Sequence, residues 1–271
     1  MITLLILLAV VVSAYLFLIM PRMAGRPDFS PLMGWHYAHR GLHDNASDAP
    51  ENSMAAIRKA VDAGYGIEFD VQLTKDRVPV VFHDESLKRV CGAAGNVRDY
   101  TYDELQAFPL MKSEERIPRF ADVLSAVDGR VPLIIEIKIH ENAAEVCSTA
   151  DAVLKLYSGP YCMESFHPLA VHWYRKNRPE VIRGQLSSNF NSADKREPFS
   201  QFLVHHLLTN FLARPDFIAY AHAHKGNLSR RLCRTLFGAL SVAWTLRSQE
   251  ELDACRDDFD LFIFESFIPK S

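Results

Sequence analysis

The sequence lacks the features that usually identify zinc-binding, redox and nucleic-acid-binding proteins. Its five cysteines are scattered and include no CxxC pair, which argues against a zinc or redox centre and is compatible with a reducing compartment. The net charge is −3 and the pI is near 6.4, and no stripe interleaves basic with aromatic residues. We therefore expect no nucleic-acid partner.

Charge is also absent from residues 2–20, a run close to the length that a helix needs to cross a bilayer. No Lys or Arg precedes this run, whereas a cleaved signal peptide normally begins with basic residues. The pattern favours an uncleaved, single-pass anchor in the cell membrane over residues 1–21. Arg22 and Arg26 follow it and predict that the rest of the chain lies in the cytoplasm. A proline-rich stretch predicts a tether over residues 22–34.

The remaining residues, 35–271, alternate short apolar runs with amphipathic segments, which predicts a parallel α/β fold. Eight of the runs are candidate inner strands, the number that a closed (β/α)8 TIM barrel requires. They are residues 36–41, 66–73, 133–138, 161–166, 181–187, 217–222, 241–246 and 261–266. A ninth run, residues 79–84, follows too closely for a parallel crossover, so we expect an antiparallel hairpin that carries His83 over the barrel mouth.

Shorter sequence patterns predict helices around this barrel. Residues 91–118 predict a small insertion with one short helix, which Thr101 and Glu104 begin as a capping box. A helix from Phe120 to Val127 should lead into the third strand, and residues 199–215 predict one apolar helix that packs on the barrel or dips toward the bilayer. Four histidines have no carboxylate set at ligand spacing, so we interpret them as surface residues: His205, His206, His222 and His224.

Chemistry-bearing residues concentrate between residues 37 and 84. Glu68 and Asp70 are two positions apart in a predicted strand, so their side chains point to the same side. Two carboxylates on one face repel each other unless a hard cation lies between them, and the pair therefore predicts a divalent ion. His39 and His83 bracket the pair and are suited to proton transfer near neutral pH.

Two basic residues complete the candidate site. Arg40 offers a planar donor fork that suits a phosphate. Glu136 and Lys138 lie in the apolar third strand, where a structural salt bridge is the simpler alternative. Their position near the carboxyl end of a barrel strand favours a place at the active mouth. Cation, arginine and two histidines together indicate phosphoryl chemistry.

Five short motifs resemble the glycerophosphodiester phosphodiesterase family. In order, they are HRG at 39–41, PEN at 50–52, ExD at 68–70, LTKD at 73–76 and HD at 83–84. The resemblance implies a TIM barrel of the phosphodiesterase type and one Mg²⁺ or Ca²⁺ held by Glu68, Asp70 and Glu136. His39 and His83 would transfer protons, and their division into acid and base stays open.

We expect Arg40, Lys138, Glu164 and Trp244 to bind substrate. By resemblance, Lys138 would neutralise a phosphate oxygen, and Trp244 matches a tryptophan of the family that packs in the core or forms a pocket wall. The family usually has a small residue where Glu164 stands, so whether Glu164 binds substrate or hydrogen bonds within the site is open. Glu265 stands where the family tends to show an aspartate, so whether it substitutes for that residue is an open question. The chain ends soon afterwards, at Ser271, and we expect no eighth outer helix over the barrel seam.

The expected reaction is metal-dependent hydrolysis of a glycerophosphodiester to glycerol 3-phosphate and an alcohol. Water and the 2-hydroxyl of the substrate glycerol are both possible nucleophiles. The membrane segment raises one alternative, a lysophospholipase D that acts on membrane lysophospholipids. A barrel that binds without turnover is another, because fold does not fix function. The sequence leaves the alcohol, the ion and the oligomeric state open.

Overall fold

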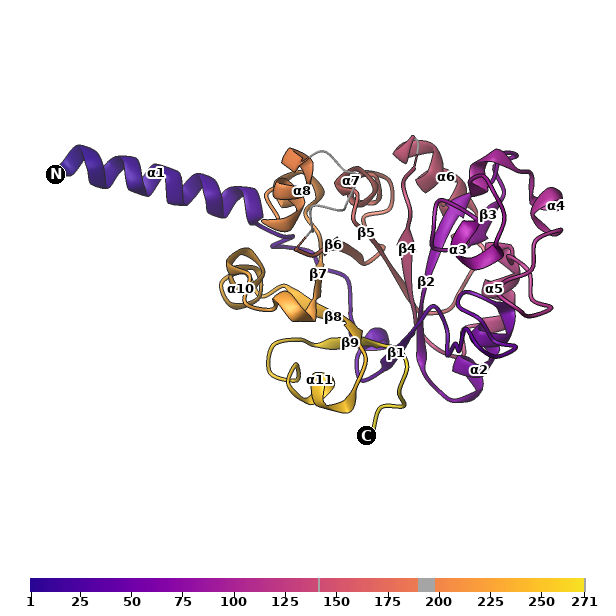
Figure 1. The fold of residues 1–271 in the computed structure, drawn as a ribbon. Coiled ribbons are helices and arrows are strands. Elements are labelled where there is room, and N and C mark those ends of the chain that lie inside the picture. Colours follow the sequence, from indigo (N-terminus) through magenta and orange to yellow (C-terminus); the bar gives the residue numbers. More distant parts are fainter. Residues whose placement is uncertain (141, 190–197, 271) are drawn as a thin grey trace.

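A closed barrel forms the centre of the structure, a computed structural model that describes residues 1–140, 142–189 and 198–270. Within these ranges the strands follow the order β1-β9-β8-β7-β6-β5-β4-β2-β3, and β1 also pairs with β2, so eight parallel strands close on themselves (Figure 1). They are β1 (His36–His39), β2 (Gly66–Leu73), β4 (Leu133–Ile137), β5 (Tyr161–Ser165), β6 (Arg183–Ser187), β7 (Phe217–Ala221), β8 (Leu240–Leu246) and β9 (Leu261–Phe264). The TIM barrel and all eight predicted inner strands are confirmed.

The ninth apolar run forms an antiparallel hairpin with the second strand, as predicted. β3 (Pro79–Val81) pairs with β2 in a register that sets Leu73 opposite Pro79. The insertion beyond it contains α3 (Lys88–Cys91), η2 (Val97–Asp99) and α4 (Tyr102–Leu105), where we expected one helix. Thr101 caps α4 as predicted, and the insertion has its own apolar cluster, which includes Val80 and Phe82.

Helices cover the outside of the barrel (Figure 1). They are α2 (Met54–Asp62), α5 (Phe120–Val127), α6 (Ala143–Leu154), α7 (Pro168–Asn177), α8 (Pro198–His205), α9 (Asn210–Ala213), α10 (Leu228–Thr235) and α11 (Gln249–Asp253). The prediction of one helix over residues 199–215 is wrong, because α8 and α9 are separate helices. Leu207 lies between them with φ of 56°, a left-handed conformation that does not continue a right-handed helix.

The amino-terminal helix α1 (Ile2–Ile19) has a mean hydropathy of 2.9 and is long and apolar enough to cross a membrane. It projects from the barrel, and only its last turns touch it (Figure 1). The Tyr15 hydroxyl is 2.8 Å from Ser229 Oγ, and the Asn210 amide donates to the Ile19 carbonyl at 2.9 Å. Ile19 is fully buried.

Residues 22–34, predicted as a tether, run along the amino-terminal ends of the barrel strands. The Arg22 amide donates to the Pro215 carbonyl, and Arg26 donates to the carbonyls of Phe237 and Gly238. The turn η1 (Ser30–Leu32) then closes that end of the barrel, where Leu32 is buried and its carbonyl accepts the Tyr37 hydroxyl at 2.6 Å. The segment therefore contacts the barrel along its length.

No helix follows β9 within the described residues. Aromatic side chains cover this part of the barrel instead. Phe264 packs edge-on against Tyr65 and Phe267, with ring centroids 5.0 and 5.7 Å apart.

Gly41, the glycine of the HRG motif, provides a test of how closely α2 packs against the loop after β1. Its φ is +82°, and an added Cβ would lie 2.8 Å from the backbone of Ala56 in α2. Gly64 has a similar φ of +74° but open space around it. We expect Gly64→Ala to lower the free energy of unfolding by about 1 kcal/mol, from backbone strain alone.

Gly41→Ala adds a collision with main-chain atoms, so it should cost a further 1 to 3 kcal/mol or thereabouts. Thermal unfolding of the two variants in one detergent measures the difference. Equal losses in both would show that α2 does not depend on this close approach.

Candidate active site

A cavity of about 150 Å³ opens where the carboxyl ends of the barrel strands meet. Its lining combines charged and apolar side chains from seven of the eight barrel strands or the loops that follow them. It contains His39, Arg40, Glu68, His83, Glu136, Glu164, Phe166, Leu186, Trp244, Thr245, Arg247 and Ile263. Asp70 and Lys138 lie beside it in contact with these residues.

Four carboxyl groups share the inner face of three neighbouring strands. The sheet register sets Asp70 opposite Glu136, and Glu136 opposite Glu164. Glu68 is two residues before Asp70 in β2 and points to the same side. All four are at least nine-tenths buried, and one oxygen from each of Glu68, Asp70 and Glu136 lies within 4.8 Å of the others.

Two basic side chains partly balance these acids. Lys138 Nζ lies 3.0 Å from Asp70 and 2.7 Å from Glu136. Arg40 Nε lies 3.5 Å from Asp70 Oδ2, which also accepts the Asn52 amide at 2.9 Å. Lys138, Arg40 and Asn52 therefore all stabilise the ionised form of Asp70.

The pKa directions follow this arrangement. Burial raises the pKa of Glu68 well above its usual range, and the charges of Asp70 and Glu164 add to the effect. Burial and the charge of Glu136 likewise raise the pKa of Glu164. Burial acts on Asp70 too, but Lys138 and other cations outweigh it and lower its pKa. Two permanent cations do not neutralise four carboxyl groups, and this deficit together with the three converging oxygens fits one divalent cation.

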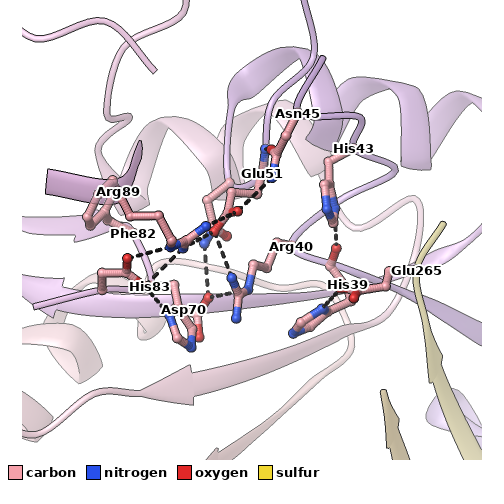
Figure 2. A network of polar contacts seen from close by, with 12 residues as sticks. His39, Arg40, His43, Asn45, Glu51, Asp70, Phe82, His83, Arg89 and Glu265 are labelled. Atoms are coloured by element: carbon pink, nitrogen blue, oxygen red, sulfur yellow. Dashed lines mark hydrogen bonds and ion pairs between the residues drawn. The ribbon is translucent and has the colours of Figure 1, made fainter. Parts of the chain in front are cut away.

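His39 is held by a residue at the far end of the chain. Its Nδ1 contacts Glu265 Oε2 (Figure 2), and its Nε2 lies 3.8 Å from Glu68. Burial lowers the pKa of His39 to about 4, so the ring is neutral at pH 7. Burial opposes ionisation of Glu265, but His39 outweighs it and holds its pKa at about 2. An ionised Glu265 accepts a hydrogen, so His39 carries its proton on Nδ1 and leaves Nε2 free to accept one.

His83 belongs to a second polar network. Its Nδ1 lies 2.6 Å from Asp84 Oδ1, and Arg89 donates to both Asp84 and Glu51 (Figure 2). Gln72 of β2 donates to the carbonyls of Phe82 and Asp84, both at 2.8 Å. The hairpin therefore fixes the backbone on either side of His83.

Two motifs that carry the family resemblance meet in an unusual backbone arrangement. Arg40 and Asn52 both have positive φ, 55° and 58°, and the backbone N–H of Asn52 donates to the Arg40 carbonyl at 2.9 Å. Non-glycine residues in this region concentrate at functional sites. The turn brings Arg40 between Glu51, at 2.7 Å, and Asp70 (Figure 2).

Apolar side chains form the opposite wall of the cavity. Trp244 packs edge-on against Phe166, with centroids 5.5 Å apart, and Leu186 and Ile263 lie beside them. Arg247 lies at the exposed rim and pairs with Glu265 at 2.7 Å. A bound molecule would therefore meet charge on one side and an apolar surface on the other.

The structure brings all nine predicted site residues together in or beside one cavity, while their roles stay predictions. Glu265, which the sequence left open, contacts His39. Arg89 and Arg247 were missed, because an arginine outside a motif gives no signal of its own. The histidines at 205, 206, 222 and 224 belong to no metal-ligand cluster among the described residues.

A TIM barrel with this mouth defines a hydrolase of phosphoric diesters, and comparison with known proteins supports the class. Residues 39–257 match the Glycerophosphoryl diester phosphodiesterase family, so the chain belongs to that family and is a glycerophosphodiester phosphodiesterase.

Individual relatives agree with this family. The chain is 28% identical to YhdW of Bacillus subtilis over 79% of its own length and 86% of the relative. It is 33% identical to a human lysophospholipase D over 48% of its length and 45% of that protein. Its fold is similar to that of an Oleispira antarctica phosphodiesterase in complex with the product sn-glycerol-3-phosphate, with a TM-score of 0.69, 22% identity and coverage of 86% and 93%.

Glu51 provides a pH-dependent test of the network around Arg40 and Arg89. Burial disfavours its ionised form, but hydrogen bonds from Arg89 and the charge of Arg40 outweigh burial and lower its pKa to about 2. Because the folded-state pKa lies below the ordinary value of 4.5, the carboxylate stabilises the fold above pH 4.5. That contribution, roughly 3 kcal/mol, disappears as the pH falls from 4.5 toward 2.

Glu51→Gln should therefore lower the free energy of unfolding by roughly that amount at pH 7, and by progressively less below pH 4.5. Urea unfolding across this pH range measures it, with Glu114→Gln on the exposed surface as the control. A loss that stays constant with pH would contradict the assigned pKa.

Proposed function

We propose that this chain hydrolyses glycerophosphodiesters to glycerol 3-phosphate and an alcohol, and that the reaction requires one divalent cation. The observation that carries the proposal is the convergence of three buried carboxylates and two histidines on one cavity. Family membership supports the substrate class, as does the fold-level likeness to a phosphodiesterase that holds glycerol 3-phosphate as its product.

Glu68, Asp70 and Glu136 would hold the cation. Their oxygens are hard ligands of the kind that Mg²⁺ and Ca²⁺ prefer, and both ions remain candidates. When bound, such an ion supplies positive charge that stabilises the phosphoryl oxygens. The protein contributes fixed positive charge of its own, since Arg40 and Lys138 lie against the same carboxylates and can bind the phosphate oxygens.

His39 is proposed as the general base. Its ring is neutral at pH 7, and Glu265 holds the Nδ1 proton so that Nε2 can accept a proton from the nucleophile. His83 is proposed as the general acid that protonates the leaving alkoxide, with Asp84 fixing the orientation of its ring. This assignment fits the different environments of the two rings, because His39 is the more buried and His83 lies at the edge of the mouth.

The remaining cavity residues would position the substrate. Burial raises the pKa of Glu164 and so favours its protonated form, which would donate a hydrogen bond to a substrate hydroxyl. Trp244 and Phe166 would contact the carbon skeleton.

Removal of metal tests the central claim. We expect a chelator to abolish hydrolysis of glycerophosphocholine by the full chain, and added Mg²⁺ or Ca²⁺ to restore it. Glu68→Gln should lower kcat/KM by roughly a hundredfold or more and weaken cation binding, measured by calorimetry. Glu114→Gln is the matched control. Full activity in the presence of chelator, or in Glu68→Gln, would refute the assigned cation site.

Substitution of Glu265 tests whether this residue determines which nitrogen of His39 carries the proton or only packs against the ring. In Glu265→Gln the amide can donate to Nδ1, which would leave His39 with its proton on Nε2 and unable to act as a base. We expect kcat to fall roughly tenfold to a thousandfold with little change in thermal stability, whereas Glu265→Asp keeps an acceptor and more of the activity. Equal activity of the two variants would show that Glu265 does not select the proton position.

Membrane lysophospholipids are a second candidate substrate. The apolar helix α1 and the partial match to a human lysophospholipase D favour them. The cavity of about 150 Å³ is smaller than typical ligand pockets of roughly 300 Å³ or more, so an acyl chain would have to extend outside it. Parallel assays of glycerophosphocholine and lysophosphatidylcholine decide between the candidates, and we expect the higher kcat/KM for the smaller substrate.

We also propose that α1 is a retained anchor. Its last turns supply buried contacts to α9 and α10, including the Ile19 carbonyl that Asn210 and Cys233 use as an acceptor. Cleavage after the apolar run would remove these partners and expose the surface that Ile19 covers. The basic residues that follow the helix favour a cytoplasmic barrel.

A further inference from the structure

A second cavity, of about 380 Å³, lies where α1 joins the barrel. Residues 20–24 form one wall, which includes Arg22. Three more arginines and one proline form the rest: Arg175, Arg183, Arg214 and Pro179. Arg183 is the first residue of β6, so this cavity lies at the amino-terminal ends of the strands. The catalytic cavity lies at the opposite ends.

Positive charge in this arginine cavity exceeds the negative charge that faces it. Asp216 is 3.4 Å from Arg22 and 3.5 Å from Arg183. Arg175 and Arg214 donate instead to backbone carbonyls, those of Leu212 and Met20. Among the residues that the structure describes, one carboxylate thus stands against four guanidinium groups.

Arg183 shows the imbalance most clearly. The residue is 2% exposed, its Nη1 lies 3.5 Å from Asp216, and its Nε has no hydrogen-bond acceptor among the described residues. Burial lowers its pKa, and the charges of Arg22 and Arg175 add to this effect against the attraction of Asp216. An anion in the cavity would offset the repulsion between these guanidinium groups and accept hydrogen bonds from those that line it.

The position of α1 places this cavity at the level of lipid headgroups. Tyr15, Leu16 and Ile19 pack on the barrel, whereas residues 2–14 are exposed. At 1.5 Å per residue this free part spans roughly 20 Å, less than the hydrocarbon core of about 30 Å. The barrel surface beside α1 must therefore approach the bilayer closely, and exposed Phe17 and Phe211 pack together there, with centroids 6.1 Å apart.

We propose that the arginine cavity binds the phosphate headgroup of an anionic phospholipid in the leaflet next to the barrel. Guanidinium forks match phosphate oxygens, and juxtamembrane basic residues attract anionic lipids. The wall formed by Met20, Pro21 and Met23 continues directly from the apolar helix, which favours a lipid over a free anion. The proposal requires α1 to be retained, and it is independent of the reaction at the other end of the barrel.

The test uses the full chain purified in an uncharged detergent, with intact mass confirming that α1 is present. Dioctanoyl phosphatidylglycerol, dioctanoyl phosphatidylcholine and inorganic phosphate are titrated separately, and the shift in Tm gives each affinity. We expect only phosphatidylglycerol to stabilise the protein. Arg175→Gln combined with Arg214→Gln should weaken its binding about 25-fold, at roughly fivefold for each charge removed.

Matched variants separate binding from folding. Arg175→Lys with Arg214→Lys keeps the charges and should retain most of the binding, while Arg231→Gln removes an exposed arginine of α10 outside the cavity and should change nothing. Equal binding of phosphatidylcholine or phosphate, unchanged binding in the glutamine pair, or an equal loss in Arg231→Gln would overturn the proposal. So would loss of binding in Arg40→Ala alone, since the lipid would then occupy the catalytic cavity, or an intact mass that lacks α1.

Discussion

The crowding of Glu68, Asp70, Glu136 and Glu164 on one inner face is the constraint on which the rest of the mouth depends. Buried carboxylates this close cannot all be ionised unless positive charge accompanies them. Lys138 and Arg40 supply part of it, while burial and the charge of Glu136 raise the pKa of Glu164. The proposed cation would contribute to this electrostatic balance, and the barrel supplies the rigid register that keeps the acids together.

The cationic side chains around these acids are also held in arrangements that cost free energy. Arg40 has a left-handed backbone conformation, and the buried Glu51 joins it to Arg89. Arg89 in turn reaches Asp84 beside His83. One continuous network therefore connects the loop after β1 with the hairpin after β2, so the two histidine-bearing segments depend on the same buried acid.

Much of the architecture could be predicted because the signals were local. Apolar runs located all eight barrel strands, and the two-residue spacing of Glu68 and Asp70 showed that they share a face. The pairing of His39 with Glu265 joins residues 226 positions apart, and no local pattern reveals it. The break at Leu207 was missed for another reason: leucine is a strong helix former, and its left-handed conformation there is not encoded by a glycine or a proline. Arg26 likewise gives no sign in the sequence that it contacts carbonyls more than two hundred residues away.

The separate apolar cluster of the insertion has a consequence for how this enzyme can diversify. Val80 and Phe82 anchor the hairpin in that cluster, so His83 and Arg89 are presented by a small module with its own interior rather than by the barrel wall. Such a module can change in size, sequence or tilt without disturbing the inward-facing acids. Selectivity toward different leaving groups can then evolve in one part of the molecule while the acidic cluster stays constant.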